Sequence, residues 1–190
     1  MSSQEKIMEY YAYEPVHISQ YKNEFTELLK LFKLAEVHSV LELGTHYGGT
    51  LYQWLQHTKR GDKIVAVDDH HLNNEMYSDW NKGQELHVVK GKSQSEGVVE
   101  TVQNLGPYDF IFIDASHLYD DVKLDWEKYG EMTNPNKNSL IAFHDIMPHP
   151  NTEVDKLWEE IKDHYTNWEL IEEEDQSGCG VGVLLIERRN

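Results

Sequence analysis

The most informative part of this sequence reads Val40-Leu41-Glu42-Leu43-Gly44-Thr45-His46-Tyr47-Gly48-Gly49-Thr50. A short apolar run ends beside an acidic residue, Gly44 opens a tight turn, and Gly48-Gly49 begin a helix whose N-terminus presents free amides. The loop has neither Gly-x-Gly-x-x-Gly nor a Lys-Ser/Thr ending, so it is not a typical phosphate loop. Glu42 favours an amine-bearing or cationic ligand instead. An ordinary tight strand–helix turn is the alternative.

Short apolar runs alternate with helical stripes along the rest of the chain, as expected of parallel strands covered on both faces. The predicted strands are Val40–Leu43, Ile64–Val67, Leu86–Val89, Phe110–Ile113, Leu140–Phe143, Trp168–Ile171 and Val181–Ile186. No helix separates the last two. This order predicts an α/β fold, a Rossmann-like three-layer sandwich around a seven-stranded, mostly parallel sheet whose last strand is antiparallel. We expect one compact domain, with 1–36 as an N-terminal helical cap (its helix over 18–34) and 37–190 as the sheet domain.

The composition limits the partners of this chain. Its 190 residues include 34 acidic and 17 basic ones, a formal net charge of −17 at pH 7. Nucleic acids and anionic membranes bind clustered Lys and Arg, so neither is an expected partner. Cys179 is the only cysteine, so an intrachain disulfide is excluded. No apolar run is long enough to span a membrane, and the two observations together predict a cytoplasmic protein. Cys179 itself is interpreted as a small residue in a turn.

Polar residues follow the second and third predicted strands. Asp68 ends the second, at a position where one carboxylate can accept hydrogen bonds from both hydroxyls of a ribose. Its neighbour Asp69 fits a surface turn better. Lys92 and Ser93 follow the third strand, and Ser93 is either a ligand contact or a helix cap.

The fourth and fifth predicted strands end in carboxylates and imidazoles. Asp114 is followed three residues later by His117, and His144-Asp145 end the next strand. Neighbouring parallel strands end side by side, so Asp114, His144 and Asp145 are expected to converge on a divalent cation, Mg²⁺ or another. His117 is the candidate general base, since its ordinary pKa lies near working pH. The alternatives are that Asp114 only touches a cofactor, that His144 packs under a loop, and that His117 is a first-turn helix residue.

The first motif, Glu42-Leu-Gly-Thr-x-Tyr-Gly-Gly-Thr50, resembles motif I of class I S-adenosylmethionine-dependent methyltransferases. The runs from Phe112 to Trp126 and from Ile141 to Ile146 are similar to the branch of cephalosporin-hydroxylase-like proteins and of rhamnosyl and macrocin-type sugar O-methyltransferases. The resemblance implies a cofactor site formed by Glu42, Gly44, Thr45, Tyr47, Gly48, Gly49, Asp68, Ser93, Asp114 and Ala115, and a cation site at Asp114, His144 and Asp145. Lys92 stands where the family often has an acid, which leaves adenine recognition by that loop open.

The resemblance predicts S-adenosylmethionine-dependent O-methylation of a small hydroxylated molecule, a sugar or secondary metabolite, with His117 and Asp114 as catalytic residues. A non-catalytic cofactor-binding protein of the same fold is the alternative from another class, and a nucleotide-dependent oxidoreductase is a weaker one. Tyr10, Tyr11 and Tyr13 would suit association into a homo-oligomer.

Overall fold

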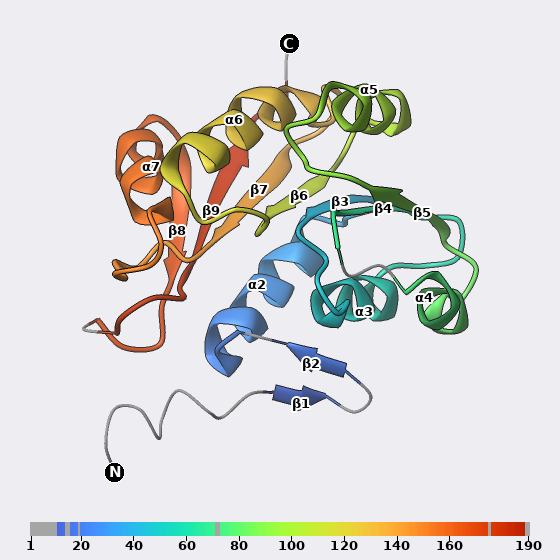
Figure 1. Cartoon of the computed structure of the whole chain (residues 1–190), viewed down its shortest axis with the longest axis horizontal. Helices are drawn as coiled ribbons and strands as arrows, with labels where there is room; N and C mark the ends of the chain where they lie inside the picture. The colour runs from blue at the N-terminus through green and yellow to red at the C-terminus, as the bar shows by residue number, and fades with distance from the viewer. Residues whose placement is uncertain (1–10, 14–15, 19, 71–72, 175, 189–190) are drawn as a thin grey trace.

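The computed structural model describes residues 11–13, 16–18, 20–70, 73–174 and 176–188, and for 11–13 and 16–17 the backbone alone (Figure 1). The strands of the main sheet are β3 (Ser39–Leu43), β4 (Lys63–Asp68), β5 (Glu85–Lys90), β6 (Phe110–Ile113), β7 (Ser139–His144), β8 (Thr166–Leu170) and β9 (Val181–Ile186). The helices are α2 (Lys22–Leu34), α3 (Gly49–His57), α4 (Asn74–Trp80), α5 (Glu96–Leu105), α6 (Tyr119–Tyr129) and α7 (Val154–Ile161). Each predicted strand is present to within two residues at either end.

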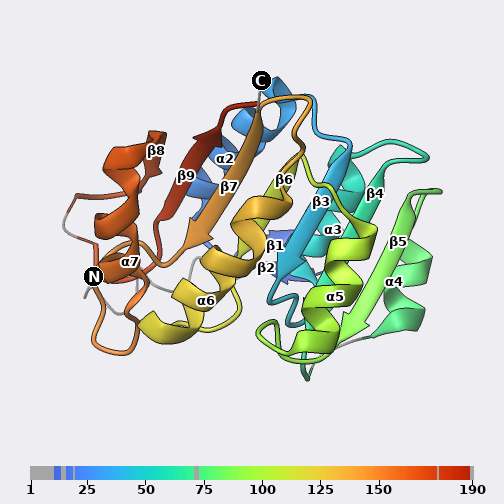
Figure 2. The ribbon, with the colours of Figure 1, turned by 90° about the horizontal axis from the view of Figure 1, so that it is seen from above.

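The sheet has the strand order β5-β4-β3-β6-β7-β9-β8 (Figure 2). β3 pairs in parallel with both β4 and β6, and β9 is antiparallel to both of its neighbours, β7 and β8. The predicted fold, a mostly parallel seven-stranded sheet between helices, is therefore confirmed. The chain leaves β3 toward one edge of the sheet and returns to the other side through β6, and ligands bind at such a switch point, beyond the carboxyl ends of the strands.

Helices cover both faces of the sheet (Figure 1). An apolar core lies between the sheet and the helices on each face. On one face, Phe25 and Leu28 of α2 and Trp54 of α3 pack against Val40 and Phe110. Side chains of a strand alternate between faces, so Leu41 and Ile111 enter the other core, with α5, α6 and α7. Each fully buried large apolar side chain contributes about 1.5–3 kcal/mol to stability, so the sheet edge that carries the loops rests on a rigid base.

The N-terminal segment differs from the predicted helix over 18–34. The helix begins at Lys22, and Ile18 belongs to β2 (Val16–Ile18), which pairs antiparallel with β1 (Tyr11–Tyr13). Ile18 is extended because it pairs with Tyr11, so the prediction that Ile18 begins the helix, made from apolar spacing, was wrong. The side chains of Tyr10, Tyr11 and Tyr13 lie outside the described residues, and both self-association and the boundary at 36/37 stay predictions.

Candidate active site

The loop after β3 is shaped by a glycine that no other residue could replace without a shift. Gly44 has φ +90°, and a Cβ built on it would overlap the backbone carbonyl of Asp114 at the end of β6. Its N–H donates to the Val67 carbonyl at 2.9 Å, and the Asp114 N–H donates to the Leu43 carbonyl at 2.9 Å. The three strand ends are thereby tied together, which holds the loops at fixed distances from one another.

These strand ends surround a cavity of about 490 Å³, which we call the central cavity. The predicted site residues that line it are Gly44, Thr45, Tyr47, Gly49, Asp68, Asp114, Ala115, His117, His144 and Asp145. This volume lies within the roughly 300–1,000 Å³ of small-molecule sites. The buried hydroxyl of Thr45 faces the carboxyl of Glu42 and opposes the effect of burial on the pKa of that group.

Three predicted cofactor residues, Glu42, Gly48 and Ser93, do not line the central cavity. Glu42 is 0% exposed and accepts a hydrogen bond of 2.9 Å from Nε1 of Trp54, and burial raises its pKa to about 7. Alternation along β3 explains this position, because it turns Glu42 toward the α3 face, beneath the cavity floor. Gly48, at φ +86°, is the N-cap of α3, where a Cβ would approach the Tyr77 ring at 2.6 Å. Direct contact of either residue with a cofactor stays a prediction.

Asp68 stands at the end of β4 with both carboxylate oxygens facing backbone donors. Its Oδ2 accepts from the His46 N–H at 2.7 Å and its Oδ1 from the His70 N–H at 2.8 Å. Each carboxylate oxygen has a second lone pair, so the group can still accept hydrogen bonds from a ligand. The two amides fix the orientation of the side chain at the rim of the central cavity.

Ser93 lines a second cavity of about 460 Å³, which shares Gly44, Asp68 and Ala115 with the central one. The Ser93 hydroxyl donates to Asp125 of α6 at 3.1 Å, and the Gln94 amide donates to the same carboxyl at 3.0 Å. Burial raises the pKa of Asp125 to about 7. The N-cap of α5 is Ser95, so the alternative in which Ser93 caps this helix is wrong.

The predicted convergence of carboxylates and imidazoles is found beside these cavities. Nδ1 of His144 lies 3.4 Å from Oδ1 of Asp114 and 3.3 Å from Oδ2 of Asp145. Nε2 of His117 lies 3.5 Å and 3.2 Å from the same two oxygens. The helix α6 begins at Tyr119, so His117 belongs to the loop before it and is not a first-turn residue.

The charges of this cluster shift one another strongly. Burial alone would raise the pKa of Asp114, but the His144 and His117 imidazoles lower it to about 2. The same attraction raises the pKa of His144 well above its ordinary value against the opposing effect of burial. The Asp114 carboxylate likewise raises the pKa of His117. Such mutual shifts are typical of sites that move protons or bind cations.

The donor set fits a divalent cation. Donor atoms that share one ion at about 2.0–2.2 Å lie roughly 2.8–3.6 Å from each other, and the imidazole–carboxylate distances of 3.2–3.5 Å fall in this range. Two groups of donor atoms lie within 4.8 Å of one another, Asp114-His117-Asp145 and His144-Asp145-Cys179. Nε2 of His144, on the other side of the ring, is buried and faces the thiol of Cys179, which helps to raise the pKa of the imidazole.

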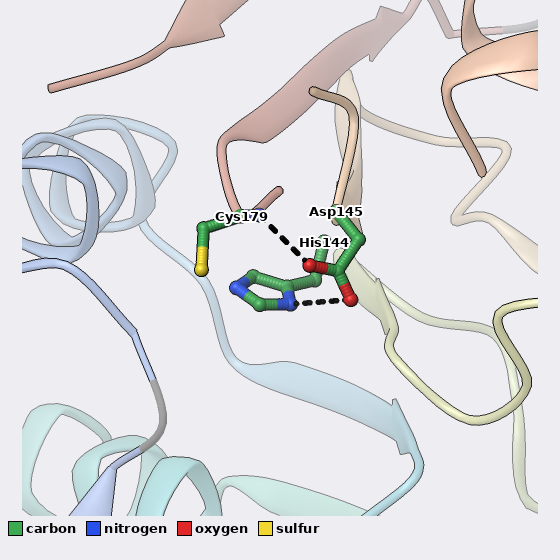
Figure 3. A group of neighbouring side chains, drawn as sticks. All are labelled: His144, Asp145 and Cys179. Atoms are coloured by element: carbon green, nitrogen blue, oxygen red, sulfur yellow. Dashed lines mark hydrogen bonds and ion pairs between the residues drawn. The ribbon is translucent and has the colours of Figure 1, made fainter. Parts of the chain in front are cut away.

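Gln20 and Cys179 line the central cavity, and neither was predicted as a site residue. Gln20, just before α2, donates from Nε2 to Oδ2 of Asp114 at 3.4 Å. Cys179 lies in a turn, as expected, but it also lines the central cavity, and its N–H donates to Oδ1 of Asp145 at 3.0 Å (Figure 3). Nothing local in the sequence marks Gln20. Cys179 lies between two glycines, and this pattern predicted a turn but no contact with the cavity.

A family model described as a methyltransferase domain matches residues 41–146. This chain belongs to the methyltransferase domain family. Among curated methyltransferases, the ribosomal RNA large subunit methyltransferase E of Treponema denticola is 30% identical over 99 residues, which are 52% of this chain and 46% of that protein. A protein of Sinorhizobium fredii is 28% identical over 118 residues, 56% of this chain and 13% of its own length. The chain thus spans less than half the length of both curated relatives.

Solved methyltransferases share the fold. The O-methyltransferase of Bacillus cereus in complex with S-adenosylhomocysteine superposes with a TM-score of 0.64 and 15% identity, over 88% of this chain and 83% of that chain. The MycE methyltransferase of the mycinamycin biosynthetic pathway, in complex with Mg, S-adenosylhomocysteine and mycinamycin VI, gives 0.61 and 16%, over 86% of this chain and 49% of that chain. The class I methyltransferase fold expected from the glycine motif is thereby confirmed.

Proposed function

We propose that this methyltransferase uses S-adenosylmethionine to methylate a hydroxyl of a small molecule, a sugar or a secondary metabolite. The observation that carries the proposal is that one cavity is lined both by the cofactor loop with Gly44 and Asp68 and by the cluster with Asp114 and His117. Methyl transfer requires this combination, because the attacking oxygen, the methyl carbon and the base must meet in line.

The cofactor half of the cavity matches the parts of S-adenosylmethionine, which when bound supplies a methyl group activated on a sulfonium. Gly44 lets the loop after β3 pass close to the backbone of Asp114, which holds the loop at the edge of the cavity. Asp68 is oriented by two backbone amides, and its carboxylate accepts hydrogen bonds from the ribose hydroxyls. Ser93 and Lys92 line the second cavity, where the adenine would lie.

His117 is the proposed general base. Its side chain is 44% exposed at the cavity, so an acceptor can reach the ring. Nδ1, the nitrogen that does not face the carboxylates, takes the hydroxyl proton while the oxygen–methyl bond forms and the carbon–sulfur bond breaks. Asp114 and Asp145 orient the ring through the N–H of Nε2 and stabilise the imidazolium that results, because their oxygens lie 3.2–3.5 Å from Nε2.

Asp114, His144 and Asp145 are the residues that would hold a divalent cation. Such a cation would lower the pKa of an acceptor hydroxyl beside it and neutralise the crowded carboxylates. The protein contributes a buried frame for it, since His144 is 6% and Asp145 8% exposed.

The charge of the chain supports a small acceptor. A formal net charge of −17 repels nucleic acid and anionic membrane surfaces. Within the described residues, no helix combines the length and apolar character needed to cross a bilayer.

Thermal unfolding with S-adenosylhomocysteine, with NAD and with buffer alone tests the proposal, each with a chelator and with added cation. We expect S-adenosylhomocysteine to stabilise the protein and NAD not to do so. In a separate assay, we expect transfer of a labelled methyl group from S-adenosylmethionine to at least one member of a panel of hydroxylated acceptors. Absence of stabilisation would overturn the proposal. Stabilisation without any transfer would favour the non-catalytic cofactor-binding protein, and stabilisation by NAD the oxidoreductase.

A further inference from the structure

Glu24, in the first turn of α2, is an acid that the fold buries, with 1% of its surface exposed. Its Oε1 accepts hydrogen bonds from Nε2 of Gln176 at 2.6 Å and from the Glu172 N–H at 3.2 Å, and its Oε2 accepts one from the Gly180 N–H at 3.1 Å. All three donors lie between β8 and β9. Because a buried carboxylate is costly unless hydrogen bonds satisfy it, Glu24 holds this segment and α2 to each other.

The segment that Glu24 holds ends in a turn of unusual backbone conformation. Gly178, Cys179 and Gly180 have φ of +79°, +55° and +77°. The conformation of Cys179 is strained, and a residue persists in such a conformation only where its surroundings fix it. The Met147 N–H fixes one side of the turn by donating to the Cys179 carbonyl at 3.0 Å. Glu24 fixes the other side through the amide of Gly180, so the turn depends on a side chain of α2.

The turn brings the Cys179 N–H to Asp145, the residue that follows β7. This amide donates to Oδ1 of Asp145 at 3.0 Å (Figure 3). The other oxygen, Oδ2, lies 3.2 Å from Nε2 of His117 and 3.3 Å from Nδ1 of His144. One oxygen therefore anchors the carboxylate to the turn, which fixes the direction in which the other oxygen faces the two imidazoles.

We propose that Glu24 is a positioning residue for the methyl transfer, because by holding the turn at 178–180 it keeps the Asp145 carboxylate beside His117. Glu24 is not among the residues that line the central cavity, so it acts only through the turn. A displacement of about 1 Å caused by a mutation far from the chemistry can lower a rate by about 100-fold. The inference rests on the proposed function, but the contact on which it depends can be measured without turnover.

Nuclear magnetic resonance of the full chain labelled with ¹⁵N-cysteine tests this contact, because Cys179 is the only cysteine and gives a single backbone amide signal. Glu24→Gln keeps the size of the side chain but turns its NH₂ group toward hydrogen-bond donors. We expect the Cys179 amide proton to move upfield in this variant, because its hydrogen bond to Asp145 lengthens. An unmoved signal in the folded variant would overturn the proposal, whether or not the parent protein transfers methyl groups.

The catalytic consequence is measured with a hydroxylated acceptor that the parent protein methylates. We expect Glu24→Gln to lower kcat by about 10–100-fold while the affinity for S-adenosylhomocysteine stays unchanged. Glu24→Asp, which keeps the carboxylate on a shorter side chain, should lower kcat and move the amide signal in the same directions by less, and it replaces the first variant if that one does not fold. A loss of cofactor affinity as large as the loss of kcat would contradict a positioning role.

Two control variants on α2 separate positioning from loss of stability. Glu27→Gln removes an exposed acid that is paired with Lys30, and should leave the amide signal and kcat unchanged. Leu28→Ala truncates a fully buried side chain, so it should lower the unfolding temperature without moving the amide signal. The same movement of the signal in Leu28→Ala would mean that the turn responds to stability alone, and would overturn the proposal. Failure of S-adenosylhomocysteine to stabilise the parent protein would overturn the proposed function instead.

Discussion

At the ends of β3 and β4 the cavity is held by backbone hydrogen bonds and by amides that face Asp68, whereas at the ends of β6 and β7 ionisable side chains face one another. Buried carboxylates show the same contrast. Burial raises the pKa of Glu42, on β3, and of Asp125, on α6 beside the second cavity, to about 7, while facing imidazoles lower that of Asp114, at the end of β6, to about 2. The groups that face a carboxylate therefore decide its charge more than the extent of its burial does. The first half is suited to holding a cofactor and the second to moving charge.

Gly44→Ala should produce the largest effect, because the added Cβ meets the backbone of Asp114 and the φ of +90° disfavours alanine. We expect a loss of more than about 3 kcal/mol of unfolding free energy, and no stabilisation by S-adenosylhomocysteine. Gly61→Ala is the matched control, since its φ is +86° and a Cβ there has nothing within 4 Å. Its expected loss is about 1 kcal/mol. Equal losses in thermal unfolding would mean that the cofactor loop is not confined by β6.

His117→Ala should affect the other half alone. Loss of the base is expected to lower kcat by about 10²–10⁴-fold while the affinity for S-adenosylhomocysteine stays unchanged. His164→Ala serves as the control, because His164 is exposed and is not among the residues that line the central cavity. A parallel loss of cofactor affinity in His117→Ala, measured by calorimetry, would show that the two halves are not separable.

Asp68→Asn tests the cofactor half through a side chain. Removing a charged acceptor is expected to weaken S-adenosylhomocysteine binding by about 1.5–3 kcal/mol, with little change in kcat at saturating cofactor. Asp69→Asn, at the next residue, should change the affinity much less, because the Asp69 carboxylate is paired with the His70 ring although it also lines the cavity. If the two variants lose affinity equally, the ribose contact does not belong to Asp68 in particular.

Asp125→Asn should give the smallest effect, and one that depends on pH. The pKa of Asp125 is about 7 in the folded protein and ordinarily 3.8, so its contribution to stability is complete below pH 3.8 and is lost as the pH rises to about 7. The variant should therefore gain on the order of 1–2 kcal/mol relative to the parent between pH 5 and 7, and no more above pH 7. Denaturant unfolding at a series of pH values measures this. A gain that instead grew toward acid pH would mean that Asp125 is ionised in the folded state.

The strands and the glycine loop could be predicted because their signals are local. Phe110–Ile113 and Val181–Ile186 were predicted to the residue, since each is an uninterrupted apolar run bounded by polar residues. Capping was less predictable, because Ser93 and Ser95 are equally good N-cap residues and only the contact of Ser93 with Asp125 separates them. Ile18 was wrongly placed in the helix, because the spacing of apolar residues carries no information on the pairing of β2 with β1.

The sequence by itself determined the alternation of strands and helices, the methyltransferase loop and the kinds of side chain at each strand end. Only the tertiary structure decided that Glu42 turns beneath the cavity floor and that Cys179 and Gln20 come to the cluster of Asp114 and His144. The physical reason is that turns and strands follow from nearest neighbours along the chain. The distance between two side chains at the sheet edge depends instead on strand order, on register and on the reversal of β9, which bring together residues far apart in sequence.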